Sequence, residues 1–165
     1  MQICVVIITR NEELNIGRCL DSLHEVADEI IIVDALSTDR TEEICRGYPN
    51  LQFFSRTWAG YAAAKNFGDA QAQSDFILSI DADEMLSEPL RLEILKNKPI
   101  LRGAYQMPRL NHIGDKAIKF SGWYPDVKVR LFPKSAARWE GDYVHEKLVY
   151  KGETQYLKHD LLHYT

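Results

Sequence analysis

The feature that most constrains the fold is an alternation of short apolar runs and amphipathic stretches in the first half of the chain. Residues 3–8 (ICVVII), 29–33 (EIIIV), 51–55 (LQFFS) and 75–80 (DFILSI) have the length and composition of strands, most of them covered on both faces. Helical patterns separate them, the clearest being an apolar stripe at Ile16, Cys19, Leu20 and Leu23. This order predicts an α/β fold whose mostly parallel sheet carries helices on both faces.

The ends of two helices carry their own signals. Asp39, followed by Glu42, has the spacing of a capping box and predicts the start of a short helix that runs to Cys45. Ser87 or Glu88, followed by proline, predicts the start of another helix that continues to about residue 96. A third helix is expected over residues 60–73, which are rich in alanine.

The second half has a different pattern. From residue 103 the helical periodicity fades, and extended pieces appear at 104–110, 127–132 and 144–150, separated by glycine, proline, asparagine and aspartate. Tryptophan and tyrosine are frequent there. We expect a smaller region of antiparallel strands and loops, built against one edge of the parallel sheet.

Composition excludes several classes of protein. The chain has 165 residues and a net charge of -4, whereas a general nucleic-acid binder needs a densely basic surface. No apolar run reaches the roughly 18 residues of a membrane span, and the first residues lack the basic region of a secretory signal. The three separated cysteines form neither a disulfide framework nor a zinc pattern. We expect a cytoplasmic protein, and a peripheral contact with a membrane remains open because substrates can be lipid-linked.

Polar side chains follow the apolar runs at residues 9–13, 34–39 and 81–84, and the carboxyl ends of parallel strands meet at one edge of a sheet. Asp81 and Asp83 lie two residues apart in an extended segment, so their side chains point the same way. Two carboxylates suit Mg²⁺ or Mn²⁺, which fill their remaining positions with water and phosphate oxygens. The alternative is a solvated acidic loop. Glu84 is expected to be a structural partner rather than a third ligand.

Asp34 ends the second apolar run, where a carboxylate can accept hydrogen bonds from a base or a ribose; the alternative is an aspartate that only forms a turn.

The sequence has no P-loop and no dinucleotide fingerprint, so phosphates are not held by a glycine-rich loop. It also lacks G-x-S-x-G and a credible Cys–His pair, which argues against nucleophilic hydrolysis.

Three segments, VVIITRNEELNIGRCLDSL, DEIIIVDALSTDRTEEI and DFILSIDADE, closely resemble family 2 glycosyltransferases with the GT-A fold. The segment YQMPRLNHIGDKAIKFSGWYPDVKVRLF, followed by VHEKL, is similar to bacterial enzymes that extend the inner core of lipopolysaccharide or lipooligosaccharide, including β-1,4-glucosyltransferases that act on heptose. The resemblance implies one Rossmann-like GT-A domain, with a nucleotide-sugar-binding half at 1–102 and an acceptor-side half at 103–165. Similar proteins continue into further helices, so it also implies truncation at the C-terminus.

The same resemblance implies an inverting, metal-dependent transfer of a hexose, glucose from UDP-glucose, to a saccharide such as an inner-core heptose. It places the nucleoside on residues of the first two loops (Thr9, Asn11, Glu12 and Asp34). The metal that bridges the diphosphate, Mn²⁺ or Mg²⁺, would be held by Asp81 and Asp83. Lys65 and Asn66 are assigned to donor binding, with an exposed helix face as the alternative.

Inversion in one step requires a general base on the acceptor side. The resemblance points to Asp126 in WYPD, although Pro125 stands where the family has a glutamate, and Glu146 in VHE is the rival. Arg130 is expected to pair with the diphosphate or to brace Asp126.

Three further residues complete the predicted site. His145 is a candidate metal ligand or acceptor contact, with a structural role as the alternative. Trp123 and Tyr124 are candidates for acceptor binding because aromatic faces pack on sugars, and core packing is the alternative. Trp58 and Tyr61 are expected to be packing residues.

Two other functions remain open from the sequence. A nucleotidyltransferase that makes a nucleotide sugar would use a related fold, but it would be expected to have a glycine-rich first loop with a basic residue, and TRNEE has no glycine. A non-catalytic nucleotide- or cation-binding module is the other.

Overall fold

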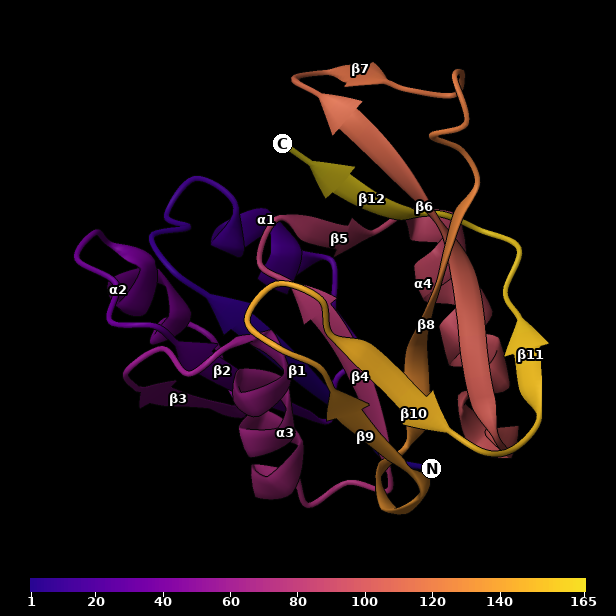
Figure 1. Ribbon diagram of the computed structural model, residues 1–165, viewed down its shortest axis with the longest axis horizontal. Coiled ribbons are helices and arrows are strands. Elements are labelled where there is room, and N and C mark those ends of the chain that lie inside the picture. Colours follow the sequence, from indigo (N-terminus) through magenta and orange to yellow (C-terminus); the bar gives the residue numbers. More distant parts are fainter.

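The computed structural model describes residues 1–165 and confirms the mixed α/β architecture (Figure 1). One large sheet runs in the order β3-β2-β1-β4-β8-β6-β12-β5, and β7 and β11 each pair with β6. Its strands are β1 (Ile3–Thr9), β2 (Glu29–Asp34), β3 (Leu51–Ser55), β4 (Phe76–Asp81), β5 (Glu84–Leu86), β6 (Ala104–Ile113), β7 (Lys116–Ala117), β8 (Asp126–Pro133), β11 (Thr154–Tyr156) and β12 (Leu161–Tyr164). The first four strands of this order are mutually parallel, as the sequence predicts.

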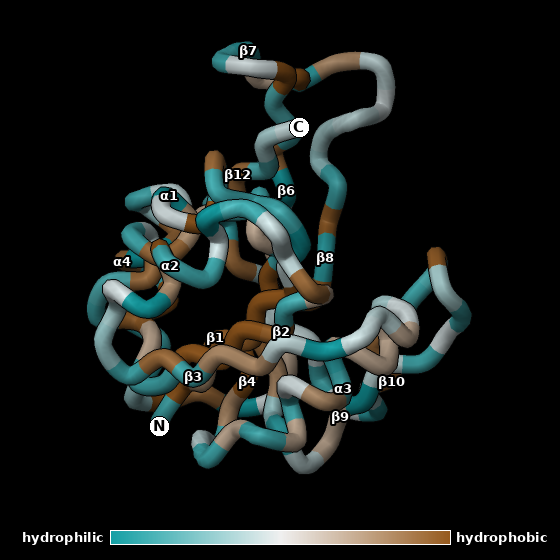
Figure 2. Tube along the Cα trace, turned by 90° about the vertical axis from the view of Figure 1, so that its left-hand side faces the viewer, coloured by the Kyte–Doolittle hydropathy of each residue, from teal (hydrophilic) through white to brown (hydrophobic).

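Alternation along β1 divides the core into two layers. Every residue of β1 is buried, and Ile3, Val5 and Ile7 face one side of the sheet while the residues between them face the other. The first side is covered by α1 (Ile16–Asp21), α2 (Thr41–Cys45) and α4 (Glu88–Asn97). Figure 2 shows β1 and β4 as hydrophobic segments in the middle of the molecule. Burial on both faces explains why these strands have no polar alternation.

The other side of the sheet is covered by α3 (Tyr61–Gln71) and a separate antiparallel pair, β9 (Ala137–Glu140) and β10 (Lys147–Tyr150). In Figure 1 this pair lies in front of β4 and beside α3. Gly68 allows α3 to approach the sheet closely, because a Cβ atom there would overlap Cγ1 of Val6. Short 3₁₀ turns, η1 (Lys98–Ile100) and η2 (Lys134–Ala136), link neighbouring elements.

The second half of the chain extends the same sheet. β8 pairs antiparallel with β4, β6 pairs antiparallel with β8, and β12 runs parallel to β6. The predicted antiparallel region at the edge of the parallel strands is therefore confirmed. Between β6 and β8 the chain projects away from the body of the protein. We call residues 113–125, which include β7, the arm, and both views show it extending beyond the other strands of the sheet (Figures 1 and 2).

The predicted capping box is wrong in one respect. Asp39 does stabilise the start of α2, because its Oδ1 accepts hydrogen bonds from the backbone N–H and the hydroxyl of Thr41. Glu42 does not reach back, since its carboxylate binds Arg46 one turn further along the helix. At the second predicted helix start, Ser87 is the N-cap and its Oγ accepts from the Leu90 N–H at 3.3 Å. None of the helices is long and apolar enough to cross a membrane.

Candidate active site

The loops that follow β1 and β2 are bound to each other. Oδ1 of Asn11 accepts from the Thr38 N–H at 2.8 Å, and the backbone N–H of Asn11 donates to Ser37 Oγ at 2.8 Å. The Glu12 N–H donates to Thr41 Oγ1 at 2.8 Å. Asn11 holds a left-handed conformation at φ 53°, which asparagine tolerates better than most residues. These contacts fix both loops without glycine, at the sheet edge where ligands of such folds bind.

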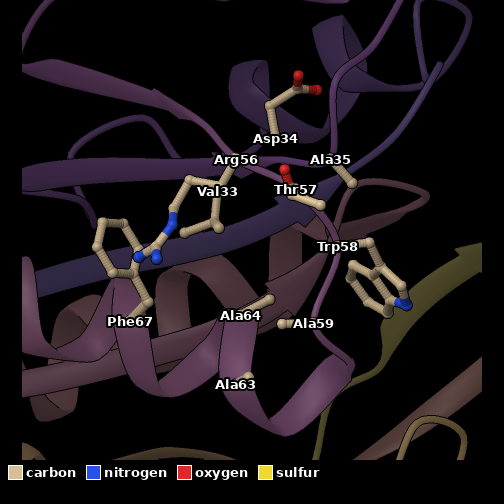
Figure 3. Close-up of a pocket in the computed structure, with 10 residues that line it drawn as sticks. All are labelled: Val33, Asp34, Ala35, Arg56, Thr57, Trp58, Ala59, Ala63, Ala64 and Phe67. Atoms are coloured by element: carbon tan, nitrogen blue, oxygen red, sulfur yellow. The ribbon is translucent and has the colours of Figure 1, made fainter.

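Asp34 is buried beneath the second loop. Its carboxylate accepts hydrogen bonds from the N–H and the hydroxyl of Ser37, so it makes the turn that the alternative interpretation predicted. It also lines a small cavity of about 60 Å³. Figure 3 shows this cavity with Arg56 lying over the ring of Phe67, its guanidinium carbon 3.7 Å from the ring centroid. Asp34 therefore orders the loop and also contributes to the wall of the cavity.

Asp81 and Asp83 line one cleft of about 490 Å³, together with Thr9 and Glu12 from the first loop. The predicted convergence of β1 and β4 at this edge is therefore present in the structure. The hydroxyl of Thr9 is buried and has no hydrogen-bond partner within the chain. Burial raises the pKa of Glu12, and the charge of Asp83 adds to that rise. The cleft is acidic, which suits a cation bound together with an anionic ligand.

Asp81 is held by buried cations. Its Oδ2 lies 3.3 Å from Arg130 Nη2, and its Oδ1 lies 3.5 Å from Lys65 Nζ. Burial alone would raise the pKa of Asp81, but the two positive charges outweigh it and hold that pKa at about 2. Glu84 is the structural partner that the sequence predicts, because its carboxylate accepts from the Asp81 N–H at 2.9 Å and binds Arg130 at 2.7 Å. Asp81 is therefore ionised and fixed before any ligand arrives.

His163 is a site residue that the sequence interpretation missed. Its Nε2 lies 3.2 Å from Oδ2 of Asp83, and its Nδ1 lies 2.7 Å from Oδ1 of Asn111. The side chain comes from β12, which pairs with β5 and places His163 opposite Glu84. His145, the histidine predicted as a ligand, lies in a different cleft of about 440 Å³, which it shares with Asp81 but not with Asp83.

Lys65 and Asn66 are positioned by α3 for different contacts. Lys65 is 1% exposed, so the alternative that it lies on an exposed helix face is wrong. Its Nζ also lies 2.8 Å from Glu146 Oε1 and 4.4 Å from the ring centroid of Trp139. The amide of Asn66 donates to the Trp139 carbonyl at 2.8 Å and accepts from the Trp139 N–H at 2.9 Å. These two hydrogen bonds of Asn66 hold β9 against α3.

Asp126 is braced by other residues than predicted. Arg109 binds its Oδ2 at 2.7 Å and Lys128 lies 3.0 Å from its Oδ1. Arg130 does not reach it, since residues four apart on a strand are about 13 Å apart. Burial would raise the pKa of Asp126, but Lys128 and Arg109 together lower it. Arg109 also lies 3.2 Å from Glu84, and Glu84 in turn binds Arg130, which binds Asp81. A series of ion pairs therefore links Asp126 to Asp81.

The aromatic residues take up several positions. Trp123 is exposed in the arm, whereas the hydroxyl of Tyr124 donates to Asp160 at 2.8 Å, a hydrogen bond that raises the pKa of Tyr124 to about 12. Trp58 and Tyr61, expected to be packing residues, line the cleft of Asp81 and Asp83 and pack edge to face on each other.

A divalent cation fits this cleft only with help from a ligand. No group of three histidine, cysteine, aspartate or glutamate side chains is arranged to hold a metal ion by itself. The contact between His163 Nδ1 and Asn111 nevertheless holds the ring so that Nε2 lies 3.2 Å from Asp83 Oδ2, and in the tautomer that donates from Nδ1 this Nε2 is an acceptor. A shared cation would satisfy both acceptors, and phosphate oxygens would complete its shell.

The comparisons with known proteins show which family the chain belongs to. The family model described as glycosyl transferase family 2 matches residues 4–98, which include both loops and the two aspartates of the cleft. The chain belongs to glycosyl transferase family 2. An uncharacterized glycosyltransferase of Rickettsia typhi is 40% identical over 93 residues, which are 56% of this chain and 32% of that protein. The lipopolysaccharide core biosynthesis glycosyltransferase LpsC of Rhizobium meliloti is 40% identical over 89 residues, 52% of this chain and 33% of that protein.

Solved structures of other proteins share the fold. S. aureus TarS, in complex with UDP, superposes with a TM-score of 0.63 at 20% identity, covering 82% of this chain and 47% of that one. Glucosyl-3-phosphoglycerate synthase of Mycobacterium tuberculosis, in complex with Mn²⁺, UDP and glucosyl-3-phosphoglycerate, gives 0.51 at 25% identity over 67% of this chain and 44% of that one. The family 2 domain described here spans about a third of the length of the curated relatives it matches.

Proposed function

We propose that this family 2 domain binds a nucleotide-diphosphate sugar together with Mn²⁺ or Mg²⁺ and transfers the hexose to a saccharide acceptor with inversion. The observation that carries the proposal is the shared cleft of Asp81, Asp83, Thr9 and Glu12. Two carboxylates from one strand end lie there beside an unpartnered buried hydroxyl from another. Such a cleft can take a cation and a diphosphate at once.

The proposed donor is UDP-glucose. Asp34 and its cavity would receive the base, and the first loop, with Asn11 and Thr9, would hold the ribose side of the nucleoside. Uridine is supported by the UDP complexes of TarS and of glucosyl-3-phosphoglycerate synthase, and the second of these also contains Mn²⁺. The hexose itself is proposed from the family resemblance.

In the proposed reaction, Asp83, Asp81 and His163 would hold the metal only together with phosphate oxygens of the donor, because no three such side chains are arranged to hold it alone. Bound there, the metal would act as a Lewis acid that neutralises charge on the departing diphosphate. Lys65 and Arg130 keep Asp81 ionised and oriented through contacts of 3.5 and 3.3 Å. His145 lies in the neighbouring cleft with Glu146 and is proposed as an acceptor contact or further ligand.

Asp126 is the proposed general base, with Glu146 as the rival. Each has one structural advantage. Asp126 is fixed by Arg109 and Lys128, and Arg109 connects it through Glu84 to the charges around Asp81. Glu146 lines the same cleft as Asp81, and its Oε1 lies 2.8 Å from Lys65 Nζ. Either carboxylate would take the proton of the acceptor hydroxyl as that oxygen attacks the sugar from the side opposite the diphosphate.

The proposed acceptor is an inner-core lipopolysaccharide-type saccharide, reached at the cytoplasmic face of the membrane by a peripheral contact. The similarity to LpsC, named for lipopolysaccharide core biosynthesis, supports this class. Trp123 and Tyr124 adjoin Asp126 in sequence and are proposed to contact the acceptor sugar.

A thermal-melt panel tests the donor site. UDP, GDP, ADP and CDP are each added with and without Mn²⁺. A ligand at 100 times its Kd stabilises by about 2.7 kcal/mol, which is a shift of about 5–10 °C for a domain of this size. We expect a shift with UDP only when Mn²⁺ is present, and its loss in Asp83→Ala. Asp75→Ala, an exposed aspartate at the other end of the β4 segment, is the matched control. An unchanged shift in Asp83→Ala contradicts the proposed site.

A further inference from the structure

The arm, residues 113–125, exposes large apolar side chains to solvent. Ile113 is 63% exposed, Phe120 is 70% exposed and Trp123 is 54% exposed. They come from the end of β6 and from the loop that returns to β8, in the part of the chain that projects beyond the sheet (Figure 1). Large apolar side chains gathered on one projection mark a contact site more often than scattered ones do.

The charges of the arm differ in sign from those of the whole protein. The arm carries Lys116 and Lys119 against Asp115, a net charge of +1, whereas the chain has a net charge of -4. Both lysines are exposed and lie between the apolar residues in sequence. Lysine next to exposed aromatic and aliphatic side chains is the composition of segments that lie in the interface of an anionic bilayer.

A protein partner fits the arm less well. Lysine is depleted in the buried centres of protein interfaces, and a stable interface buries about 800 Å² on each side, much more than a few side chains on one loop provide. The backbone also favours a hydrated surface. Between residues 119 and 125, the N–H of Trp123 is the one backbone donor bonded within the chain, to the Phe120 carbonyl at 3.3 Å. The other backbone donors there are free to bind water or phosphate oxygens.

We propose that the arm docks on an anionic phospholipid surface, with Ile113, Phe120 and Trp123 entering the headgroup region and Lys116 and Lys119 contacting phosphates. The arm would then be the part of the protein that makes the peripheral membrane contact. Only the link between that contact and a lipid-linked acceptor rests on the proposed function. The arm joins the two strands that carry Arg109 and Asp126, and Asn111, which binds His163, also approaches the Trp123 carbonyl at 3.5 Å. An arm seated on lipid would therefore hold the acceptor side of the cleft near the membrane.

Vesicle co-sedimentation tests the proposal with the whole 165-residue chain. Vesicles of phosphatidylcholine alone are compared with vesicles that also contain phosphatidylglycerol, at low and high salt. We expect binding to the anionic vesicles, weakened by salt. Phe120→Glu should reduce the affinity at least tenfold, and Lys116→Glu with Lys119→Glu should reduce it by about fivefold or more for each lysine. Ile100→Glu is the matched control, because Ile100 is also 70% exposed but lies on η1, outside the arm.

Three outcomes would overturn the proposal. The wild-type chain could fail to bind anionic vesicles, Ile100→Glu could lose as much affinity as Phe120→Glu, or Phe120→Glu could instead abolish self-association seen by gel filtration, which would make the arm a protein interface. The UDP-dependent melting shift, measured on the same variants, separates this proposal from the proposed function. We expect that shift to persist in every arm variant, so a missing shift with intact vesicle binding would count against the donor site alone.

Discussion

Nε2 of His163 lies 3.2 Å from Oδ2 of Asp83, although the two residues are 80 positions apart in the sequence. The pairing of β12 with β5 brings them together, and Asn111 on the neighbouring β6 fixes the other ring nitrogen at 2.7 Å. The side chain of His163 thus has a defined orientation toward one of the two cleft aspartates. In protein metal sites, a ligating imidazole is oriented in this way by a partner on its second nitrogen.

The first prediction concerns this contact. His163→Ala should weaken Mn²⁺-dependent UDP binding by about 10-fold to 100-fold, the range found when a ligand or its orienting partner is lost. Titration calorimetry with UDP and Mn²⁺ measures it. His24→Ala, at an exposed histidine that does not line the cleft, should bind as the wild type does. Equal affinity in His163→Ala and wild type would show that the histidine only packs against Asp83.

The second prediction concerns the buried lysine. Lys65→Met should lower the free energy of unfolding by about 3 kcal/mol, because it leaves Glu146 and Asp81 without a cation that lies 2.8 and 3.5 Å away. Urea unfolding measures the loss. Lys147→Met, at an exposed lysine next to Glu146, should change stability by less than about 0.5 kcal/mol. Adding Glu146→Gln to Lys65→Met should restore part of the loss; no recovery would mean that the pair is not the source of the effect.

The parts of the fold that the sequence could predict depend on local patterns. The strands β1, β2 and β4 are continuous apolar runs, so their burial on both faces is visible without knowing what covers them. The convergence of Thr9, Asp81 and Asp83 follows from one rule, that parallel strands end at the same edge.

Contacts between distant segments could not be predicted in this way. Asn66 binds the backbone of Trp139 across 73 positions, and neither residue carries a signal for the other. The same holds for Arg109, which takes the bracing role expected of Arg130 because β6 lies beside β8 in register with Asp126. His163 lies on a short strand whose pairing with β5 has no local signature.

The third prediction is a pH dependence. Burial raises the pKa of Asp69 from an ordinary value of 3.8 to about 7. Between these values the unfolded chain is ionised while the folded chain keeps the proton, so the stability present below pH 4 is lost as pH rises toward 7. Asp69→Asn cannot ionise and should remove this loss, which makes the variant more stable than the wild type by a few kcal/mol at pH 8. Urea unfolding at pH 4.5, 6 and 8 measures the difference. Asp75→Asn, an exposed aspartate, should keep the wild-type profile, and an equal slope in Asp69→Asn would contradict the prediction.

The fourth prediction separates the two candidate bases. Asp126→Asn removes the proton acceptor but keeps an acceptor oxygen for Arg109, so the fold and the UDP-binding cleft should survive. We expect the KM for UDP-glucose to stay within about twofold while kcat falls by about 10²-fold to 10⁴-fold, the range for loss of a general base. The assay follows UDP release with UDP-glucose, Mn²⁺ and a heptose-containing core oligosaccharide. Asp142→Asn, at an exposed aspartate in the loop before Glu146, is the control and should keep full turnover.

Glu146→Gln is measured in the same assay, because its contact with Lys65 gives it a second role. If Asp126 is the base, Glu146→Gln should alter stability through the lost ion pair and reduce kcat less than Asp126→Asn does. The opposite order, with Asp126→Asn active and Glu146→Gln inactive at unchanged UDP affinity, assigns the base to Glu146. The 440 Å³ cleft that Glu146 shares with Asp81 would then be the acceptor side of the site.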